Sequence, residues 1–171
     1  MVNGLDEEII SKMRKAGCAR IILGMETASP SLLKTINKGI TIEELEKVLK
    51  LLSKYGIWTG IEVICGLPHE TEEDIKATID FLLTNRDCID RIYCNIFDLR
   101  HPSVMFLNPE IYGIENIQEI NLYRTEDNDD FNICNFVRFS FDETNGLNWQ
   151  AKKKQMISSF WRVVKATNAH D

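Results

Sequence analysis

Residues 20–26 of the sequence read Arg20-Ile-Ile-Leu-Gly-Met-Glu26, and this stretch shows most clearly which fold to expect. Its apolar side chains recur at every second position, which is the period of a β-strand with one buried face. Residues 57–65 and 89–97 form two further short stretches of strand character. The three strand centres lie roughly 30–40 residues apart, which is the length of a βα unit with parallel strands and right-handed crossovers.

Helical patterns precede and separate these strands. A helix over residues 6–16 comes before the first strand, and Ser29-Pro30 predicts a short helix directly after it. Thr41-Ile-Glu-Glu44 is a capping box that predicts the start of a longer helix, and Gly56 predicts its end. Thr71 predicts the cap of the next helix. The order of elements therefore predicts an α/β fold with about three parallel strand–helix units.

The length of the chain limits how much of a barrel it can form. A closed barrel of eight βα units typically takes about 250 residues, and this chain has 171. We therefore expect residues 1–107 to form a partial (half) βα barrel and residues 108–171 to form a C-terminal tail subdomain.

The tail shows weaker patterns than the strands before it. Candidate strands over Ile120–Arg124 and Asn135–Phe141 predict a β-hairpin, and the acidic run Glu126–Asp130 between them is typical of a solvated loop.

A terminal helix is predicted to follow from the cap residue Asn148. An apolar stripe runs along it from Met156 to Val164, and we expect Lys152–Lys154 to lie on the opposite side of the helix.

Composition excludes several classes of protein. The formal net charge is −6, which speaks against a general nucleic-acid or anionic-membrane surface. No apolar run approaches the roughly 18 residues of a membrane span, and the acidic N-terminus does not read as a signal peptide. The cysteines are odd in number and scattered, which predicts reduced thiols in a cytoplasmic protein; they are Cys18, Cys65, Cys88, Cys94 and Cys134. They form no C-x-x-C pair, so we predict no metal site within the chain.

Two carboxylates occupy the mixed faces of the predicted strands. Glu26 ends the first strand and Glu62 lies in the middle of the second. A buried carboxylate costs several kcal/mol unless it is paired or hydrogen-bonded. Each glutamate therefore needs a partner, which is a backbone amide, ligand hydroxyl groups, or a structural ion pair with Arg20 or Arg91. A further alternative is an unrelated βα enzyme in which Glu26, Glu62 and His69 act as acid or base.

Several ordered segments resemble one enzyme family. Residues 16–29, Ala16-Gly-Cys-Ala-Arg-Ile-Ile-Leu-Gly-Met-Glu-Thr-Ala-Ser29, resemble the fourth-strand segment of radical S-adenosylmethionine enzymes, which reads roughly AGC..I..GIESGS. Lys38-Gly-Ile-Thr41 resembles the KGIT helix start of that family, and residues 60–71 resemble its fifth-strand G..FIVGLPGET. Three later segments are similar to the subgroup with an upstream cobalamin-binding domain; they are residues 95–103, 108–113 and 141–149.

The resemblance implies roles at the matching positions. Glu26 would hydrogen-bond the ribose hydroxyls of S-adenosylmethionine. Ile64 and Gly66 would contact its adenine, and Asn95 and Phe97 would line the other side of the adenosyl pocket.

The chain departs from the family in what it lacks. The C-x-x-x-C-x-x-C motif that holds a four-iron four-sulfur cluster is absent, and so are the first three strands. His69 stands where the family usually has glycine, and Thr27-Ala28 replaces Ser-Gly. The resemblance therefore implies the C-terminal half of a radical S-adenosylmethionine oxidoreductase-like enzyme, inactive alone, whose partner is the missing N-terminal half and whose cobalamin would bind an upstream domain.

The alternative is a stand-alone half-barrel that acts as a binding module. In either case three strands leave open edges, so we expect self-association or a tail that folds over one edge.

Overall fold

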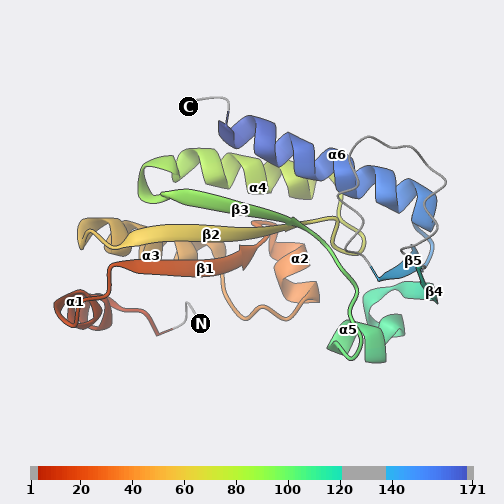
Figure 1. Ribbon diagram of the computed structural model, residues 1–171, viewed down its shortest axis with the longest axis horizontal. Coiled ribbons are helices and arrows are strands. Elements are labelled where there is room, and N and C mark those ends of the chain that lie inside the picture. Colours follow the sequence, from red (N-terminus) through yellow and green to blue (C-terminus); the bar gives the residue numbers. More distant parts are fainter. Residues whose placement is uncertain (1–3, 121–137, 169–171) are drawn as a thin grey trace.

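A three-stranded parallel sheet forms the centre of the protein (Figure 1), as described by a computed structural model for residues 4–120 and 138–168. The strands are β1 (Arg20–Glu26), β2 (Trp58–Cys65) and β3 (Arg91–Ile96), in the order β1-β2-β3. Helix α3 (Ile42–Lys54) connects β1 to β2, and α4 (Glu72–Thr84) connects β2 to β3. The expected α/β fold with three parallel strands in a partial, unclosed barrel is confirmed.

The helix ends follow the capping residues seen in the sequence. Thr41 accepts a hydrogen bond from the amide of Glu44, and the Glu44 side chain accepts one from the amide of Thr41. Thr71 and Asp74 form the same reciprocal box at the start of α4. The remaining helices before β3 are α1 (Glu7–Lys15), α2 (Pro30–Thr35) and the short 3₁₀ turn η1 (Arg86–Cys88).

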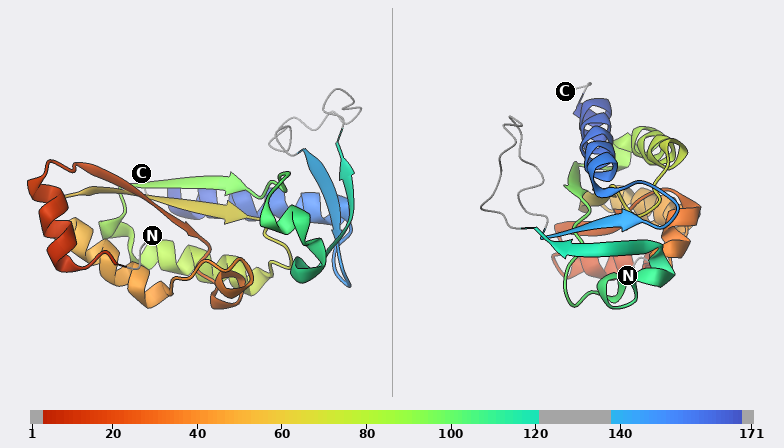
Figure 2. Two further views of the ribbon diagram at one scale, coloured as in Figure 1. Left: turned by 90° about the horizontal axis from the view of Figure 1, so that it is seen from below. Right: turned by 90° about the vertical axis from the view of Figure 1, so that its right-hand side faces the viewer.

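The helices cover only one face of the sheet. Figure 2 (left) shows α3 and α4 beneath the strands, with α6 (Trp149–Asn168) beside α4. Side chains such as Met25, Ile61 and Val63 point to this side and are buried in the main hydrophobic core. In Figure 1 the opposite face of the sheet turns toward the reader, and no described helix crosses it.

The uncovered face carries apolar and aromatic side chains. Ile22 is 52% exposed on it. The Arg20 guanidinium lies 4.3 Å from the ring centre of Trp58, and the Arg91 guanidinium lies 5.4 Å from that of Tyr93. These cation–π contacts occupy the two arginines that we considered as partners for the strand carboxylates.

Two short elements follow β3 near the carboxyl ends of the strands, α5 (Val104–Leu107) and then the 3₁₀ turn η2 (Pro109–Tyr112) at the start of the tail. A two-stranded antiparallel sheet follows, made of β4 (Ile114–Glu119) and β5 (Phe139–Glu143). The apolar residues of β4, Ile114 and Ile117, are three positions apart in the sequence. The register of β4 with β5 shifts between Glu115 and Gln118, which accommodates this spacing. This irregularity hides the strand from a search for strict alternation.

β4 ends at Glu119, so Ile120 is the one residue of the expected strand Ile120–Arg124 that the structure describes, and that strand stays a prediction. Residues 121–124, residues 135–137 and the acidic run Glu126–Asp130 lie outside the described residues. The last part of the expected strand Asn135–Phe141 coincides with β5, and the pairing of two tail strands is antiparallel as in the predicted hairpin.

Helix α6, the last element of the tail, packs along α4 and β3 (Figure 1). A second apolar cluster joins it to the strand ends, and its buried members are Leu32, Leu67, Phe97, Leu99, Ile114, Phe141 and Met156. The division into residues 1–107 and 108–171 stays a prediction, because α6 contacts elements of the first segment directly.

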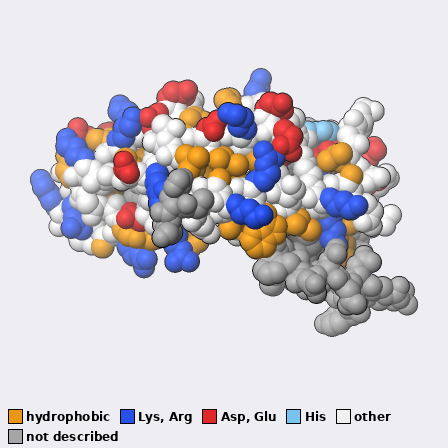
Figure 3. Space-filling model, turned by 90° about the horizontal axis from the view of Figure 1, so that it is seen from above, with side chains coloured by type: hydrophobic (Ala, Val, Ile, Leu, Met, Phe, Trp, Pro, Cys, Tyr) orange, Lys and Arg blue, Asp and Glu red, His pale blue; other side chains and the backbone are white. Residues whose placement is uncertain are grey.

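The surface around α6 mixes both signs of charge. Figure 3 shows acidic and basic side chains interspersed on the side of the molecule where α6 lies. In the described ranges, 4–120 and 138–168, none of the helices has the length and apolarity that crossing a membrane requires.

Candidate functional site

The end of β1 presents a carboxylate held by a lysine. The Glu26 carboxylate oxygen Oε1 lies 2.6 Å from Lys38 Nζ, and the two side chains are 16% and 28% exposed. The pairing of β1 with β2 shifts register between Gly24 and Glu26, and Glu26 adopts φ 67°, in the left-handed region. This backbone turn brings the side chain of the last strand residue over the uncovered face.

Gly24 makes room for this pair. A Cβ at Gly24 would lie 2.6 Å from Glu26 Oε1 and 3.0 Å from Lys38 Nζ. The side-chain partner of Glu26 is therefore Lys38, and the alternative of an ion pair with Arg20 or Arg91 is not the one that the structure shows. Lys38 begins the Lys38–Thr41 segment that resembles the family motif. Its contact with Glu26 was not predictable, because the position of Lys38 depends on the path of the chain through the short helix α2.

Two other predicted residues lie on the same face. Ile64 and Asn95 are register partners on β2 and β3. They follow the register partners Glu62 and Tyr93 by two residues, so they lie on the same face, nearer the carboxyl ends of the strands. Asn95 is exposed and Ile64 is partly buried. The structure thus brings Glu26, Ile64 and Asn95 together at the carboxyl end of the uncovered face.

Gly66 and Phe97 turn instead toward the tail. The Gly66 amide donates a hydrogen bond to Glu70 Oε2 at 2.9 Å, and a Cβ at Gly66 would overlap the side chain of Met156. Phe97 is 7% exposed, and its ring packs edge-on against Phe141 at 5.8 Å between centroids. Both residues lie at the junction between the strand ends and the tail.

Glu62 and His69 have surroundings that differ from those of Glu26. Glu62 is exposed in the middle of β2. The His69 ring Nε2 lies 3.1 Å from the Gly113 carbonyl oxygen, and its backbone amide donates to Glu143. His69 has φ 58°, which explains why a glycine would suit its position.

A buried ionic group lies behind the loop that follows β2. Lys152 Nζ is 2.7 Å from Glu143 Oε1, and the two side chains are 0% and 4% exposed. Burial lowers the pKa of Lys152, against the effect of Glu143. Burial would raise the pKa of Glu143, but the hydrogen bond and charge of Lys152 hold it below its ordinary value. Burial raises the pKa of the neighbouring Glu70 to about 7.

The expectation that Lys152 lies opposite the apolar stripe of α6 is wrong. Lys152 precedes Met156 by four residues, so both side chains lie on the same face of the helix. The spacing of four residues between Lys152 and Met156 is the sequence signal that indicates this shared face.

The described cysteines do not provide a cluster site. In residues 4–120 and 138–168, no three His, Cys, Asp or Glu side chains come together as metal ligands. Cys65 Sγ and Cys94 Sγ lie 3.5 Å apart, and the hydrogen bond with Cys94, together with burial, raises the pKa of the Cys65 thiol. This pair of thiols is fewer than the four thiolates that hold a four-iron four-sulfur cluster.

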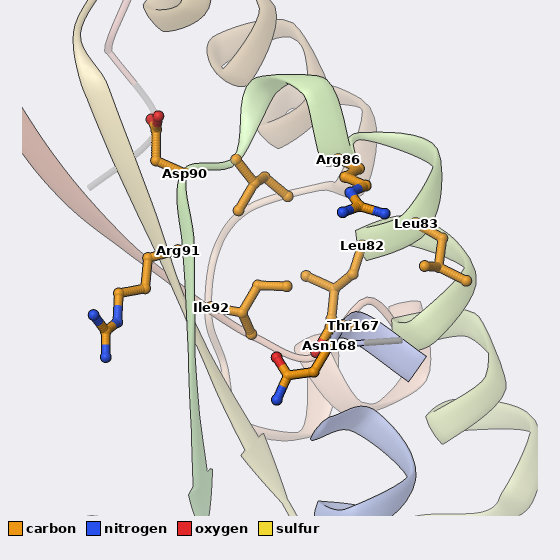
Figure 4. Close-up of a pocket in the computed structure, with 9 residues that line it drawn as sticks. Leu82, Leu83, Arg86, Asp90, Arg91, Ile92, Thr167 and Asn168 are labelled. Atoms are coloured by element: carbon orange, nitrogen blue, oxygen red, sulfur yellow. The ribbon is translucent and has the colours of Figure 1, made fainter. Parts of the chain in front are cut away.

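A hollow of about 470 Å³ lies at the other end of the sheet, among the end of α4, the start of β3 and the end of α6 (Figure 4). Leu82, Arg86, Ile92 and Asn168 are among the residues that line it. It is separate from the Glu26 face, because Ile92 lies near the amino end of β3.

Comparison with known proteins supports one family. Residues 1–82 match the family model of the Radical SAM superfamily. An uncharacterised methyltransferase of Pyrococcus horikoshii is 38% identical over 80 residues, which are 47% of this chain and 17% of that protein. The anaerobic magnesium-protoporphyrin IX monomethyl ester cyclase of Rubrivivax gelatinosus is 38% identical over 73 residues, 43% of this chain and 13% of that protein.

The fold is similar to that of a solved enzyme. The radical S-adenosylmethionine methyltransferase TsrM of Kitasatospora setae, solved with cobalamin and a [4Fe-4S] cluster bound, superposes with a TM-score of 0.65. The match has 20% sequence identity and covers 95% of this chain and 34% of TsrM. This chain thus spans about a third of that enzyme and less than a fifth of the two sequence relatives.

Proposed function

Residues 1–82 belong to the Radical SAM superfamily, and on this premise we propose that the chain supplies the adenosyl side of the S-adenosylmethionine site of a radical SAM enzyme. The observation that carries the proposal is the Glu26 carboxylate, which Lys38 holds over Gly24 at the carboxyl end of the sheet. In parallel βα folds, ligands bind at this end of the strands.

The residues at this end fit the adenosyl group in type and exposure. A carboxylate has two oxygens and can accept hydrogen bonds from two neighbouring ribose hydroxyls. Ile64 offers an apolar side chain beside it, and the exposed Asn95 amide can donate to or accept from a polar ring edge. Gly66 and Phe97 would form the boundary of the site on the side where they contact Met156 and Phe141 of the tail.

S-adenosylmethionine is the source of radical chemistry in this family, and the electron comes from a four-iron four-sulfur cluster. Because the described cysteines do not fit such a cluster, we place its ligands outside this chain, on an N-terminal half-barrel that completes the enzyme. The same reasoning makes the isolated chain catalytically inactive. We also propose that the whole enzyme is an oxidoreductase, that it is located in the cytoplasm and that it uses cobalamin.

Two measurements on the 171-residue chain test the proposal. Titration with 5′-deoxyadenosine is expected to give saturable binding that weakens about tenfold in Glu26→Gln, which lacks the negative charge. Glu62→Gln, a change of the same kind on the same face, is the control and should bind as the wild type does. Equal affinity in all three proteins would overturn the assigned role of Glu26.

Anaerobic reconstitution with iron and sulfide tests the second part. We expect neither a stable cluster absorbance nor cleavage of S-adenosylmethionine by the isolated chain. A chain that assembles a cluster and releases 5′-deoxyadenosine would show that the ligands are present and that the chain is active alone.

A stand-alone binding module is the second candidate, and one observation favours it. The uncovered face exposes Ile22 together with partly buried aromatic rings, and β1 and β3 end the sheet on either side. Such a surface can pair with another chain or with a second copy. Self-association through this face is therefore part of the proposal, and light scattering as the concentration rises tests it.

A further inference from the structure

The loop after β2, residues 66–70, is bonded to side chains that come much later in the sequence. The Leu67 carbonyl accepts a hydrogen bond from Lys152 Nζ at 2.7 Å. The His69 amide donates to Glu143 Oε1 at 2.7 Å. These partners are 85 and 74 positions away in the chain, so the tail fixes two backbone groups of the loop.

All three hydrogen-bond donors of the Lys152 ammonium group have an acceptor in this position. Its ammonium group can donate three hydrogen bonds, and it has three acceptors within 2.8 Å. They are the Leu67 carbonyl, Glu143 Oε1 and Gln155 Oε1. Because the side chain is completely buried, no water can replace a lost partner without opening the junction.

The next turn of α6 adds two contacts with the same loop. Gln155 Nε2 donates to the Glu70 carbonyl. Met156 packs against Gly66, where a Cβ would overlap it. One turn of a tail helix therefore contacts both ends of the loop, and the absence of a side chain at Gly66 is what allows the helix to approach.

The loop needs such support from outside. His69 adopts φ 58°, a conformation that costs a residue with a Cβ some free energy. A strained residue persists when surrounding contacts determine its conformation. Glu143 supplies such a contact directly, through the His69 amide.

We propose that Lys152 and Glu143 are positioning residues for the adenine side of the cofactor site. They act through the loop backbone, and the loop starts directly after Ile64 and Cys65 at the end of β2. This inference rests on the proposed function, because the loop borders the adenosyl group only if that group binds at the Glu26 face. It makes the tail a part of the binding site although no tail side chain need touch the ligand.

Amide resonances of the loop provide the test. The Gly66 and His69 amides each donate to a carboxylate, so both should resonate downfield in the wild-type spectrum. In Lys152→Met we expect both resonances to move and the loop amides to exchange about tenfold faster than in the wild type, while β1 amides keep their rates. Affinity for 5′-deoxyadenosine should fall about tenfold in the same variant. Lys154→Met changes an exposed lysine of the same helix and should alter neither property.

A milder variant keeps the test decisive if Lys152→Met does not fold. Gln155→Leu removes the bonds to Lys152 and to the Glu70 carbonyl without leaving a buried charge. It should shift the same amides and weaken binding in the same direction. Loop amides and affinity that stay unchanged in a folded variant would overturn the inference. A wild-type chain that binds no 5′-deoxyadenosine would instead overturn the proposed function, and the loop amides would still show whether the tail holds the loop.

Discussion

Lys38 Nζ lies 2.6 Å from Glu26 Oε1, directly over the backbone of Gly24. The two side chains are partly exposed, so solvent screens their attraction and the pair adds little to stability. Its effect is geometric, because the lysine fixes the direction of a carboxylate that would otherwise rotate freely at the end of a strand. We therefore expect changes around this pair to affect ligand binding more than folding.

Substitution Gly24→Ala should separate these two effects. The added Cβ would lie 2.6 Å from Glu26 Oε1 and would force the carboxylate and the lysine to move apart. Gly24 does not have a positive φ, so the backbone tolerates alanine. We expect affinity for 5′-deoxyadenosine to fall about tenfold by calorimetry, while the free energy of unfolding changes by less than about 1 kcal/mol. Full affinity in the alanine variant would show that the orientation of Glu26 does not matter.

Truncation of Phe97 should reduce the free energy of unfolding far more than truncation of Asn95. Phe97 is buried against Phe141, and removing such a ring typically costs about 3–5 kcal/mol. Asn95 is exposed on the uncovered face, and Asn95→Ala should leave stability within about 0.5 kcal/mol of the wild type. Urea denaturation of the two variants measures both effects. A similar loss in both would mean that the uncovered face is covered in solution.

The strands and helix ends were predictable because short-range chemistry determines them. The alternation in residues 20–26 and the capping box at Thr41 each depend on neighbours within a few positions. Asn148 is a further case, since its side chain accepts a hydrogen bond from the amide of Ala151, three residues later. The parallel order of the strands follows from the helices between them, because such crossovers connect parallel strands.

The side-chain partners were not predictable in the same way. The sequence offered the strand arginines as possible ion-pair partners of Glu26, but both arginines stack on aromatic rings and Lys38 reaches the carboxylate. Lys152 was expected to lie opposite the apolar stripe of its helix, yet it is buried against Glu143, which lies on the strand β5. Such contacts depend on how separate elements pack, and no local pattern encodes them.

The uncovered face predicts concentration-dependent association. Ile22 is 52% exposed on this face, on the edge strand β1, and fully burying such a side chain in an interface contributes about 1.5–3 kcal/mol. We expect light scattering to show dimers or larger species as the concentration rises, and Ile22→Asp to shift the equilibrium toward monomer about tenfold or more. Leu83→Asp is the matched control, since Leu83 is exposed on α4, away from this face. A wild-type chain that stays monomeric at every concentration would contradict the expectation.

Stability should fall as the pH rises toward neutrality because of Glu70. Burial raises its pKa from 4.5 to about 7, so the folded protein keeps this proton to a higher pH than the unfolded chain does. Between these two values the unfolded chain binds fewer protons, and the free energy of unfolding decreases by up to about 3 kcal/mol across the window. Glu143 has a lowered pKa, so its own contribution is lost only at more acidic pH. Urea denaturation on both sides of the window should show this decrease in the wild type and in the exposed control Glu73→Gln, but not in Glu70→Gln. If Glu70→Gln kept the same pH dependence, the proton would have to be held by another group.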